Sequence, residues 1–406
     1  MPVHDQPEIH VPRQRQRSVG QARPLRVLTL HPGSAGLKLA VLDGETSRFG
    51  HVFPGGSGLG RPELQDMVSR YDPIDVVAIR FVHGGDRPGP VLLDDDELAD
   101  LGRLSPRAPL HQPQSIELAR RVREMVPELP VVACFETSFH LGLPEHAARY
   151  GLPWPWAAQP ELRRAGFHGL SCEYALRRAA AMLHTPVELL SLVVAHLGAG
   201  VSVTAVDGGR SVDTSMGFTP SDGAVMATRS GSLDPGLVLH LVRTSGLDLE
   251  GLSSALTERA GLAGLTGGSG DMREALAARA AGDPEAGIAM RTYLHRLRRE
   301  VVATASSLAA LDALVLTGGV AEGSAWLRSE LVNGLRQLDV RVNHRRNREA
   351  SHDSLLSEPG EQVAVLLVQA REDVQLARGA AAVVARRREH LGPVRNAVDT
   401  AARRRA

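Results

Sequence analysis

Short apolar runs alternate along most of the chain with longer amphipathic segments. Runs rich in Val, Ile and Leu predict strands at 75–85, 130–136, 313–319 and 362–368, and two strand–turn–strand segments at 26–44 and 192–209. Apolar positions three and four residues apart predict helices at about 62–71, 113–125, 173–184, 272–281, 284–311, 324–338 and 372–386. Such an alternation of strands and helices predicts an α/β fold.

Two of the predicted helices carry start signals. Asp271 followed by Glu274 resembles a capping box, and Asp283-Pro284 places an N-cap before a proline at the first helical position. Two segments lack any helical or strand period. Residues 55–60, GGSGLG, are expected to form a loop, and 151–165, with three prolines and two tryptophans, either cross between domains or form a packed surface loop.

The two strand–turn–strand segments repeat one another. Residues 27–44 read VLTLH, PGSAG and LKLAVLDG, and residues 192–209 read LVVAH, LGAG and VSVTAVDGG. Each has a strand ending in histidine, a turn of small residues and a second strand leading to Asp-Gly, which predicts an internal duplication. Glycine turns expose backbone N–H groups that can hold phosphate oxygens, so the pair forms either a phosphate clamp or two ordinary hairpins.

A long polar stretch, 211–235, lies between apolar segments that are expected to form core. Loops of this length inside compact domains are usually functional or disordered, and its Met and Phe residues argue against disorder. Its one cation is Arg229, whose planar guanidinium suits a carboxylate or a phosphate. From these residues alone, Arg229 is either an anion-binding residue or a surface arginine on a structural loop.

Composition restricts the classes of function. The chain has 406 residues, which favours two domains, and a formal net charge of +0, which gives no indication of a nucleic-acid or membrane partner. No apolar run is long enough to span a bilayer, and the N-terminus has no apolar signal segment. With only Cys134 and Cys172 there is no disulfide framework, so a cytoplasmic location is expected. Residues 1–24 and 388–406 are predicted to be tails.

Common nucleotide and metal motifs are absent. The only lysine, Lys38, lies in GSAGLKL without the spacing of a P-loop, and GGSGLG lacks the context of a dinucleotide fingerprint. No HExxH and no paired cysteines indicate zinc. If a nucleotide binds, it therefore has to use the two glycine hairpins.

Short motifs are spread over about residues 25–386: GSAGLK, RFVHGGD, APLHQP, FETSFH, AGFHGLS, HLGAG, SVDTSMGFTP, ATRSGSLDP, SGDMRE, LTGGVAEGS and EDVQLAR. In their residues and their order they resemble the motifs of the acetate kinases, acyl-phosphate-forming kinases of the actin-like and sugar-kinase superfamily. SVDTSMGFTP together with ATRSG is close to a signature of the family.

The resemblance implies two duplicated actin-like (ribonuclease H-like) domains around a central cleft, predicted here at 25–160 with 374–387 and at 161–373. It also implies ATP or ADP as co-substrate, Mg²⁺ or Mn²⁺, a short-chain carboxylate such as acetate, and a homodimer. No nucleic acid and no membrane are expected as partners.

Site residues follow from the resemblance position by position. Those implied in catalysis are Arg80, Glu136, His168 and Arg229. Those implied for the carboxylate and its acyl tail are Arg80, Val82, Leu110, His111, Phe167 and Pro220. Those implied for the nucleotide are Lys38, His196, Gly198, Ala199, Gly200, Asp271, Arg273, Gly319, Val320 and Glu322. Those implied for the metal are Glu372 and His31.

Several family positions differ, mostly on the phosphate and metal side. The family's opening Asn-Ala-Gly-Ser-Ser-Ser is replaced here by HPGSAG at 31–36. Ala199 stands in place of the asparagine of the family's HLGNG, and Glu136 stands in place of the aspartate of its FDTAFH. Gly323 replaces the last residue of the family's GIGEN, and Cys172 replaces the last residue of its HGTSH. One lost charge-assisted hydrogen bond costs about 1.5–3 kcal/mol, whereas a histidine at position 31 could replace an asparagine donor. The carboxylate side is intact, which favours a divergent acyl kinase. The alternatives are a nucleotide- or acyl-phosphate-binding protein with weak or no turnover, and a kinase for propionate or another small acid.

Overall fold

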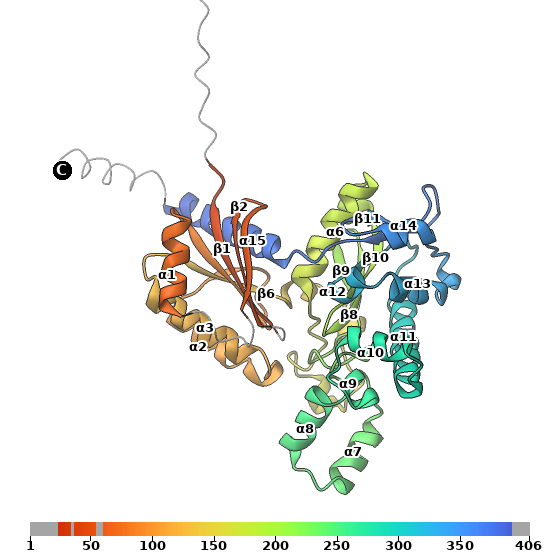
Figure 1. Cartoon of the computed structure of the whole chain (residues 1–406). Helices are drawn as coiled ribbons and strands as arrows, with labels where there is room; N and C mark the ends of the chain where they lie inside the picture. The colour runs from red at the N-terminus through yellow and green to blue at the C-terminus, as the bar shows by residue number, and fades with distance from the viewer. Residues whose placement is uncertain (1–22, 34–35, 54–59, 392–406) are drawn as a thin grey trace, which may run out of the picture.

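A computed structural model describes residues 23–33, 36–53 and 60–391 of the chain. Figure 1 shows two α/β halves, each built on one six-stranded sheet. The first sheet contains β1 (Arg26–Gly33), β2 (Gly36–Asp43), β3 (Thr46–Phe53), β4 (Val76–Phe81), β5 (Val91–Leu92) and β6 (Val131–Phe135). The second contains β7 (Ser191–Leu197), β8 (Val201–Asp207), β9 (Arg210–Thr214), β10 (Ala313–Thr317), β11 (Ser354–Leu355) and β12 (Ala364–Leu367). The predicted α/β class is confirmed.

The two sheets have the same topology. Their orders are β3-β2-β1-β4-β6-β5 and β9-β8-β7-β10-β12-β11, with an antiparallel three-strand meander followed by parallel strands and a short antiparallel edge. The register of the meander shifts at Val41/Leu42 in one sheet and at Ala205/Val206 in the other, both just before Asp-Gly. A shared irregularity at one position supports the duplication predicted from the repeated hairpins.

The core is layered. The outer face of the first sheet packs on helices that include α1 (Arg61–Arg70), α2 (Asp95–Gly102) and α3 (Gln112–Met125). Between the sheets lie α6 (Gly169–Leu183) and α15 (Glu372–Leu391), and beyond the second sheet lie α11 (Pro284–Ala305) and α13 (Ala325–Asn333). Alternate side chains of β7 point into different layers: Val193 faces the outer core, whereas Val194 faces the central layer between the sheets. Figure 1 shows α15, the last helix, beside β1 and β2.

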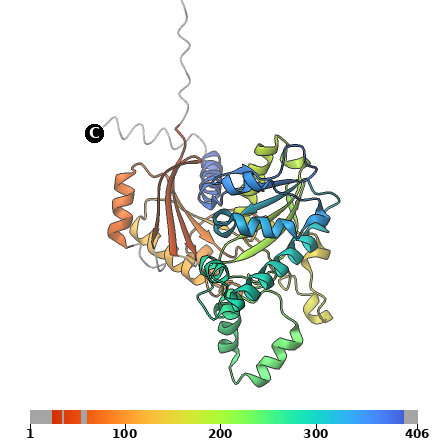
Figure 2. The same ribbon diagram turned by 45° about the vertical axis from the view of Figure 1, so that its right-hand side comes forward.

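Shorter helices complete the chain. They are α4 (Glu145–Ala148), α5 (Trp154–Ala157), α7 (Pro235–Thr244), α8 (Leu249–Glu258), α9 (Gly261–Thr266), α10 (Met272–Ala280), α12 (Gly319–Gly323) and α14 (His344–Glu349). Figures 1 and 2 show α7 and α8 projecting from the second half. Among the described residues, no helix is both long and apolar enough to cross a membrane.

Several element boundaries differ from the prediction. The stretch 211–235 is not loop throughout, because its first residues complete β9 and its last begins α7. The helix predicted to reach Leu311 ends at Ala305, and the one predicted to start at Glu173 begins at Gly169. The last helix continues into the predicted basic tail, to Leu391. The N-terminal tail up to residue 22, the loop at 54–59 and the tail from 392 lie outside the described residues.

Of the two predicted helix starts, one is as expected. Asp283 caps α11 by accepting a hydrogen bond from the backbone N–H of Ala286 at 3.0 Å. Asp271 caps α10, but Glu274 accepts from the Ser269 hydroxyl rather than reaching back to the Asp271 N–H. The predicted capping box is therefore wrong, because only the N-cap hydrogen bond of Asp271 is present. The domain boundaries stay a prediction.

Candidate active site

The predicted site residues gather where parallel strands end. Arg80 lies near the end of β4, Glu136 directly follows β6, and His196 lies near the end of β7. The carboxyl ends of parallel strands share one edge of a sheet, which is where open α/β sheets bind ligands. The fold therefore explains how residues far apart in sequence reach one place.

Arg80 and Glu136 form a nearly buried ion pair. The Arg80 Nε lies 2.8 Å from Glu136 Oε1, and the side chains are 9% and 2% exposed. Arg80 Nη1 donates to the Pro32 carbonyl at 3.1 Å, and Glu136 Oε2 accepts from the Leu170 N–H at 3.3 Å. Among the described residues, Arg80 Nη2 has no hydrogen-bond acceptor. That end of the guanidinium remains able to bind an anion.

Arg229 is a buried cation without a carboxylate partner in the described part of the chain. It is 8% exposed, and its Nη1 donates to the Pro220 carbonyl at 2.5 Å. Burial, together with the positive charge of Arg80, lowers the pKa of Arg229 to about 10. Two cations that destabilise one another in a buried site favour a bound anion between them. The surface-arginine alternative for Arg229 is excluded by its burial.

Histidines surround these arginines and are neutral. The pKa of His111 is lowered to about 3 by burial, with the charges of Arg80 and Arg229 adding. Its buried Nδ1 has no hydrogen-bond partner among the described residues. Burial, His196 and then Arg80 and Arg229 hold the pKa of His168 well below its usual value. A neutral imidazole keeps one N–H donor, so each ring can donate to an anion without adding charge.

His168 and His196 are held by serines that the sequence prediction did not include. Their rings stack with centroids 4.2 Å apart and 28° between the planes. His168 Nδ1 lies 3.0 Å from Ser202 Oγ, and His196 Nδ1 lies 2.8 Å from Ser171 Oγ. Both rings therefore have Nδ1 engaged, whereas no hydrogen bond to either Nε2 comes from the described residues. The sequence could have indicated both serines: Ser171 lies in the motif AGFHGLS, and Ser202 lies on the strand that follows the second glycine turn.

The second glycine hairpin lies directly against this cluster. A Cβ on Gly200 would stand 2.9 Å from Arg229 Nη2 and 3.4 Å from His168 Nε2, and one on Gly198 would stand 3.4 Å from His196 Nε2. Ala199 is exposed at the tip, and its carbonyl accepts from the Ala227 N–H at 3.0 Å. In the first hairpin, a Cβ on Gly33 would stand 3.8 Å from His31 Nε2. Residues 34–35 of that turn lie outside the described residues.

The predicted acyl pocket combines both halves of the chain. Val82 and Phe167 are buried in one hydrophobic cluster, 2% and 1% exposed. Leu110 and Pro220 are half-buried, and the Pro220 carbonyl is the group that accepts from Arg229. Of these four apolar residues, Pro220 directly contacts the cation that would hold a carboxylate.

The predicted nucleotide residues do not share one environment. Gly319 and Val320 begin α12 at the end of β10, and the Glu322 carboxylate accepts from the Ala370 N–H at 2.9 Å. Lys38 is exposed on β2, opposite His31 in the register. Asp271 and Arg273 pair with each other at 2.6 Å, with the Arg273 side chain 90% exposed. None of these contacts tests nucleotide binding, so the assignments remain predictions.

The donor chemistry for a divalent cation fits Glu372 better than His31. Glu372 is 8% exposed, and no hydrogen bond to its carboxylate comes from the described residues. Burial raises the pKa of the neighbouring Glu322, and the charge of Glu372 adds to this rise. Mg²⁺ is usually held by one or two carboxylates with substrate phosphates and water, so the lack of a ready three-ligand cluster among the described residues is compatible with it. An imidazole such as His31 is a poorer ligand for this ion.

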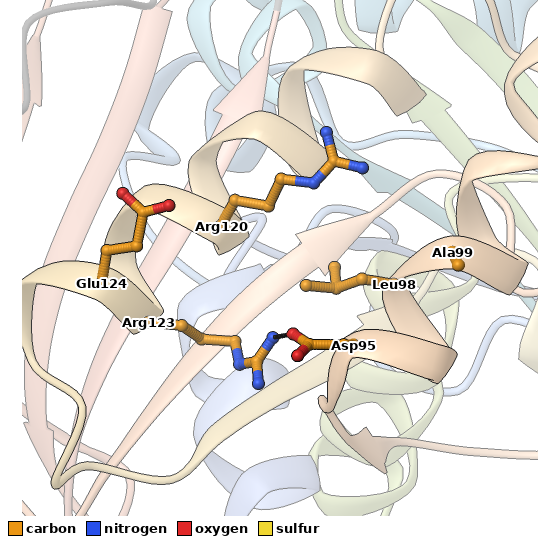
Figure 3. Close-up of a pocket in the computed structure, with 6 residues that line it drawn as sticks. All are labelled: Asp95, Leu98, Ala99, Arg120, Arg123 and Glu124. Atoms are coloured by element: carbon orange, nitrogen blue, oxygen red, sulfur yellow. Dashed lines mark hydrogen bonds and ion pairs between the residues drawn. The ribbon is translucent and has the colours of Figure 1, made fainter.

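Away from these residues, a hollow of about 460 Å³ lies between α2 and α3 (Figure 3). Its lining contains an exposed ion pair between Arg123 and Asp95, with Arg120 and Leu98 beside it. None of the predicted site residues lines this hollow.

Comparisons with known proteins agree with the motifs. A model of the acetokinase family matches residues 62–378. An acetate kinase of Deinococcus deserti is 42% identical over 362 residues, covering 87% of this chain and 90% of that protein. An acetate kinase of Bacillus cereus is 38% identical over 313 residues, covering 77% and 79%.

Solved structures give the same result. A propionate kinase of Francisella tularensis superposes with a TM-score of 0.79 at 30% identity, covering 87% of this chain and 98% of that one. An acetate kinase of Porphyromonas gingivalis gives a TM-score of 0.78 at 28% identity, covering 89% and 100%.

Proposed function

The chain belongs to the acetokinase family, and we propose that it transfers the γ-phosphoryl group of ATP reversibly to a short-chain carboxylate, acetate first. It is accordingly a phosphotransferase with a carboxyl group as acceptor. The observation that carries this proposal is the pair of nearly buried arginines, Arg80 and Arg229, set among neutral histidines. Phosphoryl transfer requires chiefly positioning and cations around a spread negative charge, and this cluster supplies both.

The reaction needs no proton transfer. One carboxylate oxygen attacks the γ-phosphorus, the bond to the bridging oxygen breaks, and its electron pair leaves on the β-phosphate of ADP. Charge balances without an acid or a base, which suits histidines whose pKa values are lowered by burial. The cluster offers no reason for a covalent intermediate, so we infer direct in-line transfer.

Within this scheme the residues have separate tasks. Arg229, at the Pro220 carbonyl, holds the carboxylate and the phosphoryl group in transfer, with Arg80 opposite. His168 Nε2 faces the Gly200 turn and donates to the phosphoryl oxygens, while Ser202 fixes its other nitrogen. Glu136 orients Arg80 through their ion pair.

The acyl tail would lie against Val82 and Phe167, with Leu110 and Pro220 at the side. Such a pocket accepts a methyl or an ethyl group, because one methylene changes binding by only ~1–3 kcal/mol. Acetate and propionate are therefore both candidate substrates.

The nucleotide would lie between the glycine hairpins and α12, with Lys38, Gly198 and Gly319 among its contacts. Glu372 would hold Mg²⁺, which when bound neutralises phosphate charge. We propose that His31 does not bind the metal. Instead, its ring N–H donates to a phosphate oxygen, as the family's asparagine would.

The chain also exposes a surface that fits a second copy. α7 has no buried residue, and Leu239, Leu247 and Leu249 on α7 and around the start of α8 are 54%, 42% and 76% exposed. An apolar patch on a projecting element marks an interface in many proteins. We propose a homodimer through α7 and α8. We also propose a cytoplasmic location, which two buried free cysteines support.

The activity is tested with purified protein, ATP, Mg²⁺ and a panel of short carboxylates, with acyl phosphate trapped as the hydroxamate. We expect hydroxamate with acetate or propionate, and a fall in yield for longer acids. ATP binding without hydroxamate from any acid would refute the kinase and support the binding-protein alternative. A preference for another acid would change only the substrate.

A further inference from the structure

His140 is a buried histidine outside every role assigned above. It is 1% exposed and ends the short 3-10 helix Ser138–His140 that follows β6. Its Nε2 lies 3.0 Å from the Phe167 carbonyl and its Nδ1 lies 2.9 Å from Ser211 Oγ. Both ring nitrogens are therefore engaged, one by the segment that carries His168 and one by β9.

The two contacts fix the protonation of the ring. A carbonyl oxygen can only accept, so Nε2 carries the hydrogen and Nδ1 accepts from the Ser211 hydroxyl. Burial lowers the pKa of His140 to about 4, which keeps this neutral form at neutral pH. His140 thus acts as a fixed donor to the Phe167 carbonyl.

The segment that His140 holds is conformationally unusual. His168 has φ 57°, in the left-handed region that residues other than glycine rarely adopt. Gly166 lies directly on the His140 ring, since a Cβ there would stand 2.5 Å from Cγ. On the other side of His168, the Gly169 N–H donates to the Glu136 carbonyl at 2.9 Å. Such a backbone persists only when its surroundings fix it, and here the turn 136–140 does so from both sides.

We propose that His140 is a positioning residue, which holds Phe167 and His168 in the geometry needed for phosphoryl transfer and links them to β9 through Ser211. The inference rests on the proposed function, because it gives His168 and Phe167 the tasks described there. His140 touches no substrate; it acts on the reacting groups through its hydrogen bond to the Phe167 carbonyl, while Ser211 holds its ring in place.

Two substitutions separate this role from a purely structural one. His140→Phe keeps an aromatic ring against Gly166 but removes both hydrogen bonds, and an error near 1 Å at the reacting groups lowers kcat by about 10²-fold. His140→Gln keeps a donor for the Phe167 carbonyl and is expected to restore most of the turnover. His146→Phe, at an exposed histidine of α4, is the control.

The kinetic test measures kcat and both KM values beside the melting temperature. We expect His140→Phe to lower kcat and raise the KM for acetate, with the KM for ATP unchanged. An equal fall in kcat in His140→Phe and His140→Gln would overturn the inference. A lower melting temperature with unchanged kcat in His140→Phe would also overturn it.

A second measurement keeps the inference separate from the activity itself. In ¹⁵N-histidine NMR, the His168 ring signals, assigned with His168→Gln, are expected to move in His140→Phe and not in His146→Phe. Unmoved signals would overturn the positioning role. An inactive wild-type protein with moved signals would refute the proposed function and leave the positioning of His168 supported.

Discussion

The guanidinium of Arg229 lies against the turn at Gly200, where a Cβ would stand 2.9 Å from Arg229 Nη2. His168 is the third member of this contact, with Cε1 3.3 Å from the same point. The backbone of Gly200 is not in the left-handed region, so its glycine is required by space rather than by conformation. Arg229, His168 and the hairpin turn at Gly200 are therefore packed as one unit.

Gly200→Ala is expected to displace Arg229 and His168 by a few tenths of an ångström or more, while the fold is retained. Since a displacement near 1 Å at the reacting groups lowers turnover by about 10²-fold, we expect kcat to fall by up to that factor. Gly142→Ala is the control, because a Cβ there meets nothing within 4 Å. Comparable kcat values for both variants in the hydroxamate assay would show that the contact has no catalytic importance.

Ala199→Asn is expected to improve the use of ATP. Ala199 is exposed at the hairpin tip, where the acetate kinase pattern has an asparagine, and a restored bond to phosphate is worth about 1.5–3 kcal/mol. The KM for ATP should fall roughly tenfold or more, with the KM for acetate unchanged. Ala199→Leu adds bulk without an amide and should leave the KM for ATP as it is in the wild type. An equal fall in this KM in both variants would rule out the hydrogen bond.

The protein is expected to lose stability in mild acid. His83, His140 and His196 are nearly buried, and burial lowers each pKa to about 4 from 6.5. Below pH 6.5 the unfolded chain binds protons that the folded one does not, so this stability is complete above pH 6.5 and falls towards pH 4. Each such histidine contributes a slope of about 1.4 kcal/mol per pH unit.

Urea denaturation at pH 7, 6 and 5 measures that slope. His83→Phe removes one of these buried histidines, so its free energy of unfolding should depend less on pH than that of the wild type. Identical slopes would mean that His83 titrates at the same pH in the folded and unfolded states.

The apolar face of α7 and α8 is expected to hold two copies together. Leu239→Glu combined with Leu249→Glu should convert a dimer to a monomer, because charges cannot be buried in such an interface without a partner. Light scattering after size-exclusion chromatography gives the mass. Leu189→Glu, at a leucine 72% exposed elsewhere, should remain dimeric. A wild-type monomer, or a dimer in the double variant, would contradict the assignment.

The sequence predicted the repeated hairpins well, because their strands and glycine turns are local features. Helix ends were less predictable. The apolar positions beyond Ala305 continue a helical period, yet the chain turns there to enter β10. β9 was hidden inside a polar stretch, because Asp213 and Thr214 follow no apolar alternation.

In the candidate site, too, local motifs could be predicted from the sequence, whereas contacts between distant segments could not. Arg80, Arg229 and His168 could be named from motifs, but their convergence depends on which strands neighbour one another. The pairing of His140 with Ser211 spans 71 residues and two sheets, so no local pattern could show it. The contacts of Glu136 could not be predicted either, because its two carboxylate oxygens reach Arg80 on β4 and the Leu170 N–H on α6.

The central claim is that Arg229 holds the group being transferred. Its most direct test is acyl-hydroxamate formation from ATP and acetate by Arg229→Ala, beside the wild type and Arg291→Ala at an exposed arginine of α11. We expect hydroxamate from the wild type and from Arg291→Ala, and none above the blank from Arg229→Ala. Turnover by Arg229→Ala equal to that of the wild type would contradict it.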